Sequence, residues 1–81
     1  MAARIRIYTT RACPYCKAAK ELLRSKGTAF EEIDVTDNAG LREKLVRMSG
    51  GRRTVPQIFA DGKSLGGYED LAAFYEKGGK L

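Results

Sequence analysis

Hydrophobic and polar residues alternate along this chain with two different periods, one typical of strands and one typical of helices. Residues 4–8 alternate around two isoleucines and predict a strand. Residues 15–26 have apolar side chains three and four positions apart and are followed by Gly27, so they predict a helix that ends at this glycine. The segment AFEEIDV, residues 29–35, predicts a second strand.

The middle of the chain returns to the helical period. A cap at Asp37 or Asn38 predicts the start of a second helix, which residues 49–51 end. We expect the apolar face of this helix to consist of Leu41, Leu45 and Met48. Strand, helix, strand and helix therefore follow one another.

The last part of the chain predicts a hairpin and a final helix. Two short strands, 57–59 and 63–65, are separated by a turn at residues 61–62. The final helix has acidic residues 69–70 in its first turn and ends at Gly78. Its apolar face is expected to consist of Leu71, Phe74 and Tyr75.

The order of these elements is βαβαββα, which predicts an α/β fold. A strand, helix and strand in succession form a parallel pair with a right-handed crossover, and the terminal hairpin adds antiparallel strands to the same sheet. We therefore expect a four-stranded mixed sheet flanked by three helices. The length of 81 residues suits a single domain, residues 1–81.

Charge and hydropathy limit the choice of partners. Lysine and arginine number 15 against 10 acidic residues, a net charge of +5. Basic and acidic residues are interleaved, which argues against nucleic acid and fits small anions, acidic protein surfaces or simply a solvated face. No stretch has the roughly 18 apolar residues of a membrane span, and no secretory signal is recognisable. We expect a cytoplasmic protein with no membrane or nucleic-acid partner.

The two cysteines of CPYC, residues 13–16, have three possible roles. A structural disulfide is disfavoured, because the cytosol is reducing and the bridge would close a very small loop. A zinc site within one chain lacks ligands, because the sequence has no histidine and no third cysteine. A reactive pair is the interpretation that these observations favour.

The position of the pair between a strand and a helix gives the two thiols different environments. Pro14 suits the first helical position, which makes Cys13 the N-cap. The sulfur of Cys13 then faces free N–H groups and the positive end of the helix dipole, which favour a thiolate. Cys16 lies one turn further in, nearer the core, and is expected to remain a thiol. Cys13 is therefore the predicted nucleophile, and Cys16 is predicted to resolve the mixed disulfide.

Three motifs together resemble the signature of dithiol glutaredoxins, especially the small bacterial ones. These motifs are CPYC at 13–16, TVPQIF at 54–59 and GGYEDL at 66–71. The resemblance covers nearly the whole chain. It implies a thioredoxin-like fold and glutathione as cosubstrate. It also implies thiol–disulfide exchange with glutathionylated proteins or with disulfides of enzymes such as ribonucleotide reductase.

The resemblance also implies contacts around Pro56. The residues alone favour a trans Val55–Pro56 bond, because few X–Pro bonds are cis. The family implies a cis bond that puts the Val55 backbone opposite Cys13, where it pairs with the cysteinyl backbone of glutathione. Thr54 is a neighbouring contact by the same comparison, although a threonine before a strand needs no function.

For the γ-glutamyl end of glutathione, the resemblance implies the start of the final helix. Backbone N–H groups near Gly67 and Tyr68 would bind the carboxylate, and the side chain of Asp70 would bind the ammonium group. Without the family comparison, helix capping explains Asp70 equally well.

The resemblance also implies an aromatic wall of the groove and a cation for the glycyl end of glutathione. Tyr15 is expected to line the groove, and Arg53, or alternatively Arg52, to bind the glycyl carboxylate. Many family members have a lysine where this chain has Thr10. We expect Arg11 to replace that lysine, and otherwise weaker stabilisation of the thiolate.

Two other functions remain open. A homodimer that carries a [2Fe–2S] cluster through Cys13 and two glutathione thiolates is the main alternative, and Pro14 counts against it because cluster-holding relatives often lack this proline. A thioredoxin-like donor that does not use glutathione is disfavoured by the GGYED carboxylate site. For the preferred oxidoreductase we expect a monomer.

Overall fold

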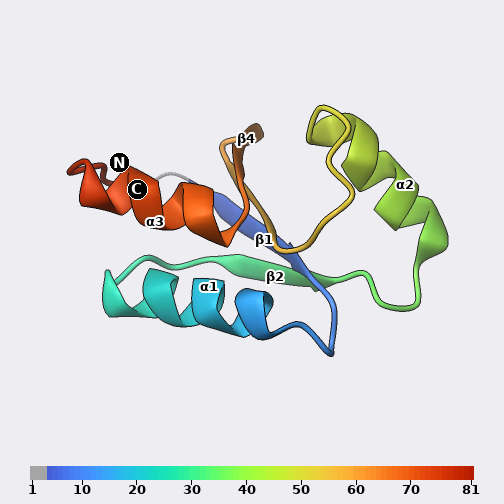
Figure 1. The fold of residues 1–81 in the computed structure, drawn as a ribbon, viewed down its shortest axis with the longest axis horizontal. Helices are drawn as coiled ribbons and strands as arrows, with labels where there is room; N and C mark the ends of the chain where they lie inside the picture. The colour runs from blue at the N-terminus through green and yellow to red at the C-terminus, as the bar shows by residue number, and fades with distance from the viewer. Residues whose placement is uncertain (1–3) are drawn as a thin grey trace.

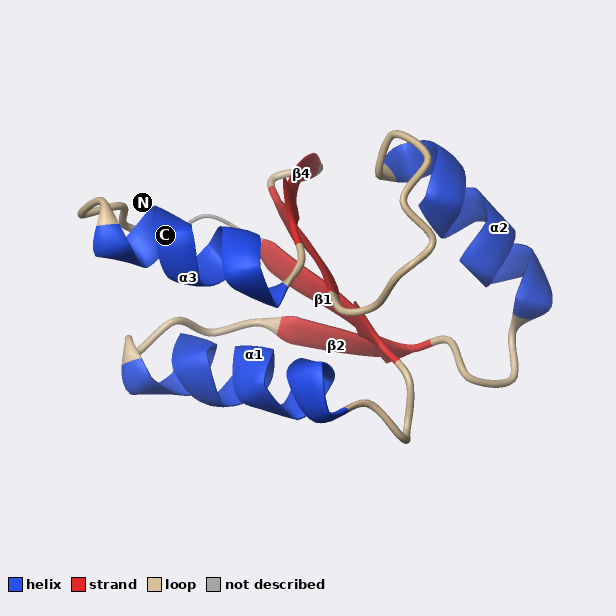
Figure 2. Cartoon of the chain, viewed as in Figure 1, coloured by secondary structure: helices blue, strands red, loops and turns tan. Residues whose placement is uncertain are grey.

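The computed structural model describes residues 4–81 and contains the seven predicted elements in the predicted order (Figures 1 and 2). The strands are β1 (Ile5–Thr9), β2 (Glu31–Asp34), β3 (Gln57–Ala60) and β4 (Lys63–Gly66). The helices are α1 (Pro14–Ser25), α2 (Ala39–Met48) and α3 (Tyr68–Glu76). Within residues 4–81, none of the helices has the length and apolarity needed to cross a membrane. The expected domain also includes residues 1–3, which lie outside the described part.

The four strands form one mixed sheet in the order β2-β1-β3-β4. Strand β1 is parallel to β2, and β3 is antiparallel to both β1 and β4. The expected α/β fold with a four-stranded mixed sheet is therefore confirmed. At its carboxyl end β1 leads into the loop before α1, so the sheet determines where the cysteine pair lies.

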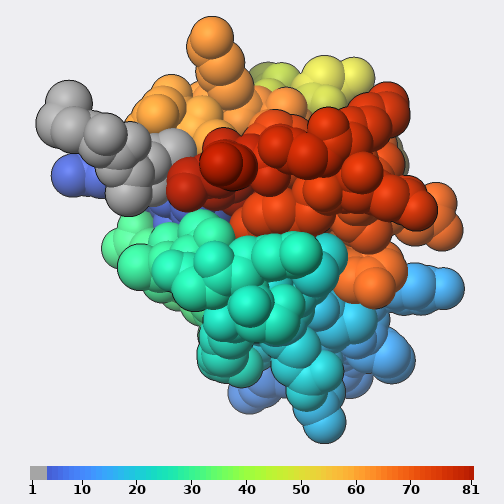
Figure 3. All heavy atoms as spheres, turned by 90° about the vertical axis from the view of Figure 1, so that its left-hand side faces the viewer, coloured from blue at the N-terminus to red at the C-terminus, as the bar shows by residue number. Residues whose placement is uncertain are grey.

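Side chains of the central strands alternate between the two faces of the sheet, as a period of two requires. Ile5, Ile7 and Ile58 belong to one buried cluster, which is completed by Ala19, Leu23 and Leu71 from α1 and α3. In Figure 3, α1 in blue to cyan and α3 in orange to red lie side by side. Tyr8 and Phe59 belong to a second cluster with Val35 and Leu45, on the side of α2. The core is thus divided between the two faces.

Two expectations about element boundaries and faces are corrected. The second strand is shorter than 29–35, because the residues of β1 that pair with it, 6–9, reach only to 31–34. Met48 is 40% exposed, whereas Leu45 is only 4% exposed. Met48 belongs to the last turn of α2 and lines an open hollow over the sheet instead of the packed cluster.

Candidate active site

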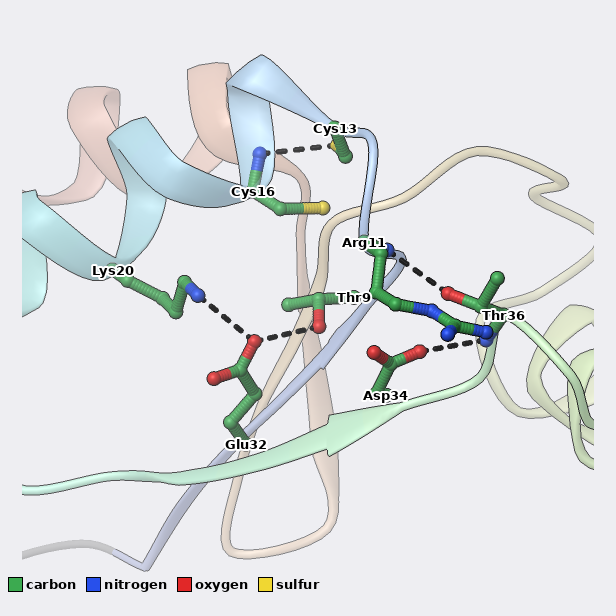
Figure 4. Close-up of polar contacts among 8 residues, drawn as sticks. All are labelled: Thr9, Arg11, Cys13, Cys16, Lys20, Glu32, Asp34 and Thr36. Atoms are coloured by element: carbon green, nitrogen blue, oxygen red, sulfur yellow. Dashed lines mark hydrogen bonds and ion pairs between the residues drawn. The ribbon is translucent and has the colours of Figure 1, made fainter.

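Cys13 is the N-cap residue of α1. Its backbone is extended, with φ −130° and ψ 102°, and Pro14 is the first helical residue, as predicted. The backbone N–H of Cys16 donates a hydrogen bond to Cys13 Sγ over 3.1 Å (Figure 4). The N-terminus of a helix and an N–H donor therefore both face this sulfur.

Cys16 has a different environment one turn further along α1. Its side chain is only 1% exposed, whereas Cys13 is partly exposed. Burial, and next the hydrogen bond with Cys13, raise the pKa of Cys16 to about 12. At neutral pH Cys16 is therefore a thiol, and the two sulfurs of one motif differ in their access to solvent.

The loop before β3 approaches Cys13 from the other side. The Val55–Pro56 peptide bond is cis, so the trans form favoured by the residues alone is wrong and the form implied by the family resemblance is confirmed. Cys13 Sγ lies 3.7 Å from the carbonyl oxygen of Val55. The backbone of Val55 is thus opposite the sulfur, where a bound peptide can pair with it.

Beside Cys13 lies a groove of about 340 Å³, within the size range of small-ligand sites. Other hollows on the protein are larger, so the chemistry of its walls distinguishes this one, not its size. Its lining residues are Tyr15, Arg52, Thr54, Val55, Pro56, Gly67, Tyr68, Glu69 and Asp70. The groove therefore brings together all the predicted glutathione contacts except Arg11 and Arg53.

The start of α3 forms one wall of this groove. Gly67 is the N-cap, and its N–H donates to Asp70 Oδ2 over 3.0 Å. The same oxygen accepts a hydrogen bond from Arg52 Nη1, also at 3.0 Å. The Gly67 N–H, and next Arg52, lower the pKa of Asp70 below its ordinary value, so this carboxyl is ionised at neutral pH. The capping role of Asp70 is thus observed, together with an ion pair that the sequence did not predict.

Gly66 makes this arrangement possible. It has a φ of +99°, which favours glycine, and a Cβ at this position would overlap Asp70 Oδ2. Because Gly66 has no side chain, the Arg52–Asp70 ion pair can occupy the space beside it.

The two neighbouring arginines have different surroundings. Arg52 lines the groove, whereas Arg53 lies outside it and is 3.7 Å from Glu43 of α2. The structure therefore places the expected groove cation, Arg53, outside the groove and on the side of α2. The alternative, Arg52, is the arginine at the groove.

Arg11 also lies away from the groove. Its backbone N–H donates to Thr36 Oγ1 over 2.9 Å, and its guanidinium group pairs with Asp37. Figure 4 shows the side chain extended toward Thr36. The expected replacement for the family lysine is therefore held by the carboxylate of Asp37, before α2.

Sequence reasoning missed a polar cluster that lies near Cys16. Thr9 Oγ1 donates to Glu32 Oε2 over 2.8 Å, and Lys20 Nζ lies 2.9 Å from the same oxygen (Figure 4). These contacts lower the pKa of Glu32, with the Lys20 hydrogen bond as the largest cause. The only signal in the sequence was the spacing of four residues between Cys16 and Lys20, which puts both on one helix face.

Comparison with known proteins agrees with this geometry. The glutaredoxin family model matches residues 5–65. Glutaredoxin 3 of Escherichia coli K12 is 49% identical over 77 residues, which cover 95% of this chain and 92% of that protein. The crystal structure of glutaredoxin 1 from Francisella tularensis, complexed with cacodylate, has a TM-score of 0.81 at 34% identity and covers 94% and 95% of the two chains. A buckwheat glutaredoxin–glutathione complex has a TM-score of 0.85 at 24% identity and covers 94% and 71%.

Proposed function

Because this chain belongs to the glutaredoxin family and is thus a thiol–disulfide oxidoreductase, we propose that it uses glutathione to reduce glutathionylated proteins and protein disulfides. The observation that supports this most is the position of Cys13. Its sulfur accepts the Cys16 N–H at the start of α1, directly beside a groove with peptide-binding backbone and charged groups. The reactive sulfur thus lies beside a site suited to the glutathione moiety of a glutathionylated protein.

The first step is attack by the Cys13 thiolate on a disulfide. With a glutathionylated protein, Cys13 Sγ bonds to the glutathione sulfur, and the bond between that sulfur and the protein sulfur breaks. The protein leaves as a thiolate and takes a proton from solvent. A second glutathione then attacks the mixed disulfide, which restores Cys13 and produces oxidised glutathione. Cys16 takes no part in this route.

The groove offers contacts for the cysteinyl and γ-glutamyl parts of glutathione. The backbone of Val55 faces Cys13 and pairs with the cysteinyl residue. The N-terminus of α3 at Gly67 and Tyr68 receives the γ-glutamyl carboxylate, and Asp70 receives the ammonium group. Arg52, paired with Asp70, adds a cation to this same γ-glutamyl wall, and Tyr15 and Thr54 complete the groove.

Protein disulfides require both cysteines. After Cys13 has formed a mixed disulfide with the substrate, Cys16 attacks Cys13 Sγ, an internal disulfide forms, and the substrate leaves as a dithiol. Ribonucleotide reductase is the enzyme substrate that the family resemblance implies. We propose that the protein acts as a monomer in the cytosol, where the reducing environment would keep this pair in the dithiol form. The match to oxidoreductases does not favour the cluster-carrier alternative.

Two single variants test this division of roles. Cys13→Ser should abolish release of glutathione from a glutathionylated peptide, measured with glutathione and glutathione reductase as the coupled system. Cys16→Ser should retain most of that activity but lose reduction of a protein disulfide. Equal loss of peptide deglutathionylation in both variants would falsify the assignment. A wild-type protein that reduces protein disulfides without any requirement for glutathione would contradict the proposed cosubstrate.

A further inference from the structure

The polar cluster of Thr9, Lys20 and Glu32 lies near the buried thiol of Cys16 (Figure 4). Thr9 and Cys16 are each only 1% exposed, and the side chain of Lys20 is only 22% exposed. Lys20 is one turn after Cys16 on α1, and Glu32 belongs to β2. The Lys20–Glu32 ion pair therefore differs from an exposed pair along one helix, because a strand residue below α1 holds the Lys20 ammonium group (Figure 4).

The influences on Cys16 change during the reaction. In the free enzyme, burial and two effects of Cys13, a hydrogen bond and a charge, oppose ionisation of Cys16. A backbone hydrogen bond with Thr10 and the charge of Lys20 favour it. In the mixed disulfide Cys13 Sγ is bonded to the substrate sulfur and has neither a charge nor a proton, so both effects of Cys13 on Cys16 are removed. Burial still opposes ionisation of Cys16 at that point, and the Thr10 hydrogen bond and the charge of Lys20 favour it. This is the moment when Cys16 must attack.

We propose that Lys20 favours the Cys16 thiolate in the resolving step and that Glu32 and Thr9 position its ammonium group for this purpose. This inference rests on the proposed function. Cys16 loses its proton to solvent and its sulfur bonds to Cys13 Sγ, while the bond between Cys13 Sγ and the substrate sulfur breaks. The cysteine pair is oxidised by two electrons, and the substrate leaves as a thiolate that takes up a proton. Lys20 keeps its own protons throughout.

A single-turnover experiment separates this step from the others. Reduced protein is mixed with a disulfide peptide, quenched with acid, and analysed by mass spectrometry for the mixed and the internal disulfide. Lys20→Met should slow conversion of the mixed to the internal disulfide by about threefold to fivefold, the range expected for a partly screened charge. Lys20→Arg should keep the wild-type rate.

Two controls distinguish an electrostatic from a structural effect. Lys17→Met removes an equal charge from an exposed position on α1 next to Cys16 and should leave the conversion unchanged. In the Cys16→Ser background, where no resolving step occurs, Lys20→Met should leave peptide deglutathionylation unchanged. Equal slowing of both reactions, or no slowing of either, would overturn the inference.

A readout without any substrate keeps this test independent of the proposed function. In Cys13→Ser, the rate of Cys16 alkylation rises with pH as the thiolate forms, and Lys20→Met should shift this profile to higher pH while Lys20→Arg and Lys17→Met do not. The charged and titratable groups that face Cys16 in this variant are Lys20 and, beyond it, Glu32. An unshifted profile contradicts the role of Lys20, even if the enzyme reduces glutathionylated peptides as proposed.

Discussion

Two helices, α1 and α3, begin at the edges of the same groove, and their N-termini differ in what occupies them. At α1 the N-cap is Cys13, whose sulfur accepts an N–H of the first turn. At α3 the N-cap is Gly67, which has no side chain, and the carboxylate that caps the helix is that of Asp70. Asp70 binds the Gly67 N–H and shares its oxygen with Arg52.

This difference separates chemistry from recognition. An N-cap sulfur uses the helix N-terminus to stabilise its own charge, so the reactive atom and its stabilising donors form one unit. An N-cap glycine leaves space for an anion from outside, and the Arg52–Asp70 pair adds one charge of each sign. The zwitterionic γ-glutamyl group of glutathione has a carboxylate and an ammonium group that match such a wall.

The strongest way to damage the α3 side alone is Gly66→Ala. The new Cβ would overlap Asp70 Oδ2 and displace the Arg52–Asp70 pair. Loss of charge-assisted contacts of this kind should raise the KM for a glutathionylated peptide more than about tenfold. Steady-state kinetics with the coupled assay measures this change.

Gly62→Ala is the matched control for this substitution. Gly62 also has a positive φ, +83°, but a Cβ there meets no atom within 4 Å. Both variants should lose about 1 to 2 kcal/mol of stability through the backbone conformation, measured by denaturant unfolding, and only Gly66→Ala should change KM. A KM that rises equally in both would contradict the role assigned to the α3 wall.

A milder change compares the two neighbouring arginines. Arg52→Gln removes the cation at the groove and should raise KM by about threefold to tenfold with kcat unchanged, because the lost contact is charge-assisted. Arg53→Gln removes a cation that lies near Glu43 outside the groove and should change KM less than about twofold. The reverse order would restore Arg53 as the groove arginine.

The smallest expected effect is on stability in acid. Because the pKa of Asp70 is lowered in the folded protein, its contribution to stability is present above its ordinary pKa of about 4 and is lost as pH falls below it. Between pH 5 and pH 3 the Tm of the wild type should therefore fall by about 2 °C more than the Tm of Asp70→Asn. Parallel curves would mean that this ion pair is fully screened.

The start of α1 could be predicted well from neighbouring residues alone. Pro14 at the first helical position and Cys13 as its N-cap follow from neighbouring residues, so the sequence was sufficient for both. The order and type of all seven elements likewise depend on short-range periodicity and on turn glycines such as Gly27. These features need no knowledge of what the chain folds against.

Contacts between distant segments were not predictable in the same way. Arg52 and Arg53 are adjacent in sequence, and only the positions of Asp70 and Glu43 in space assign them to opposite sides. Pairing of Arg11 with Asp37 likewise depends on how β1 and the segment before α2 come together. The cis form of Val55–Pro56 came from the family resemblance, since base rates for the residues alone favour trans.

Alkylation of the two cysteines tests the account most directly. The native protein is treated with limiting iodoacetamide at neutral pH, and the modified residue is identified by mass spectrometry. Because Cys13 Sγ is partly exposed and faces the α1 N-terminus, while Cys16 is 1% exposed with a pKa of about 12, we expect modification at Cys13 alone. In guanidinium both cysteines should react alike. Equal modification of the two in the native protein, or modification of Cys16 first, would contradict the account.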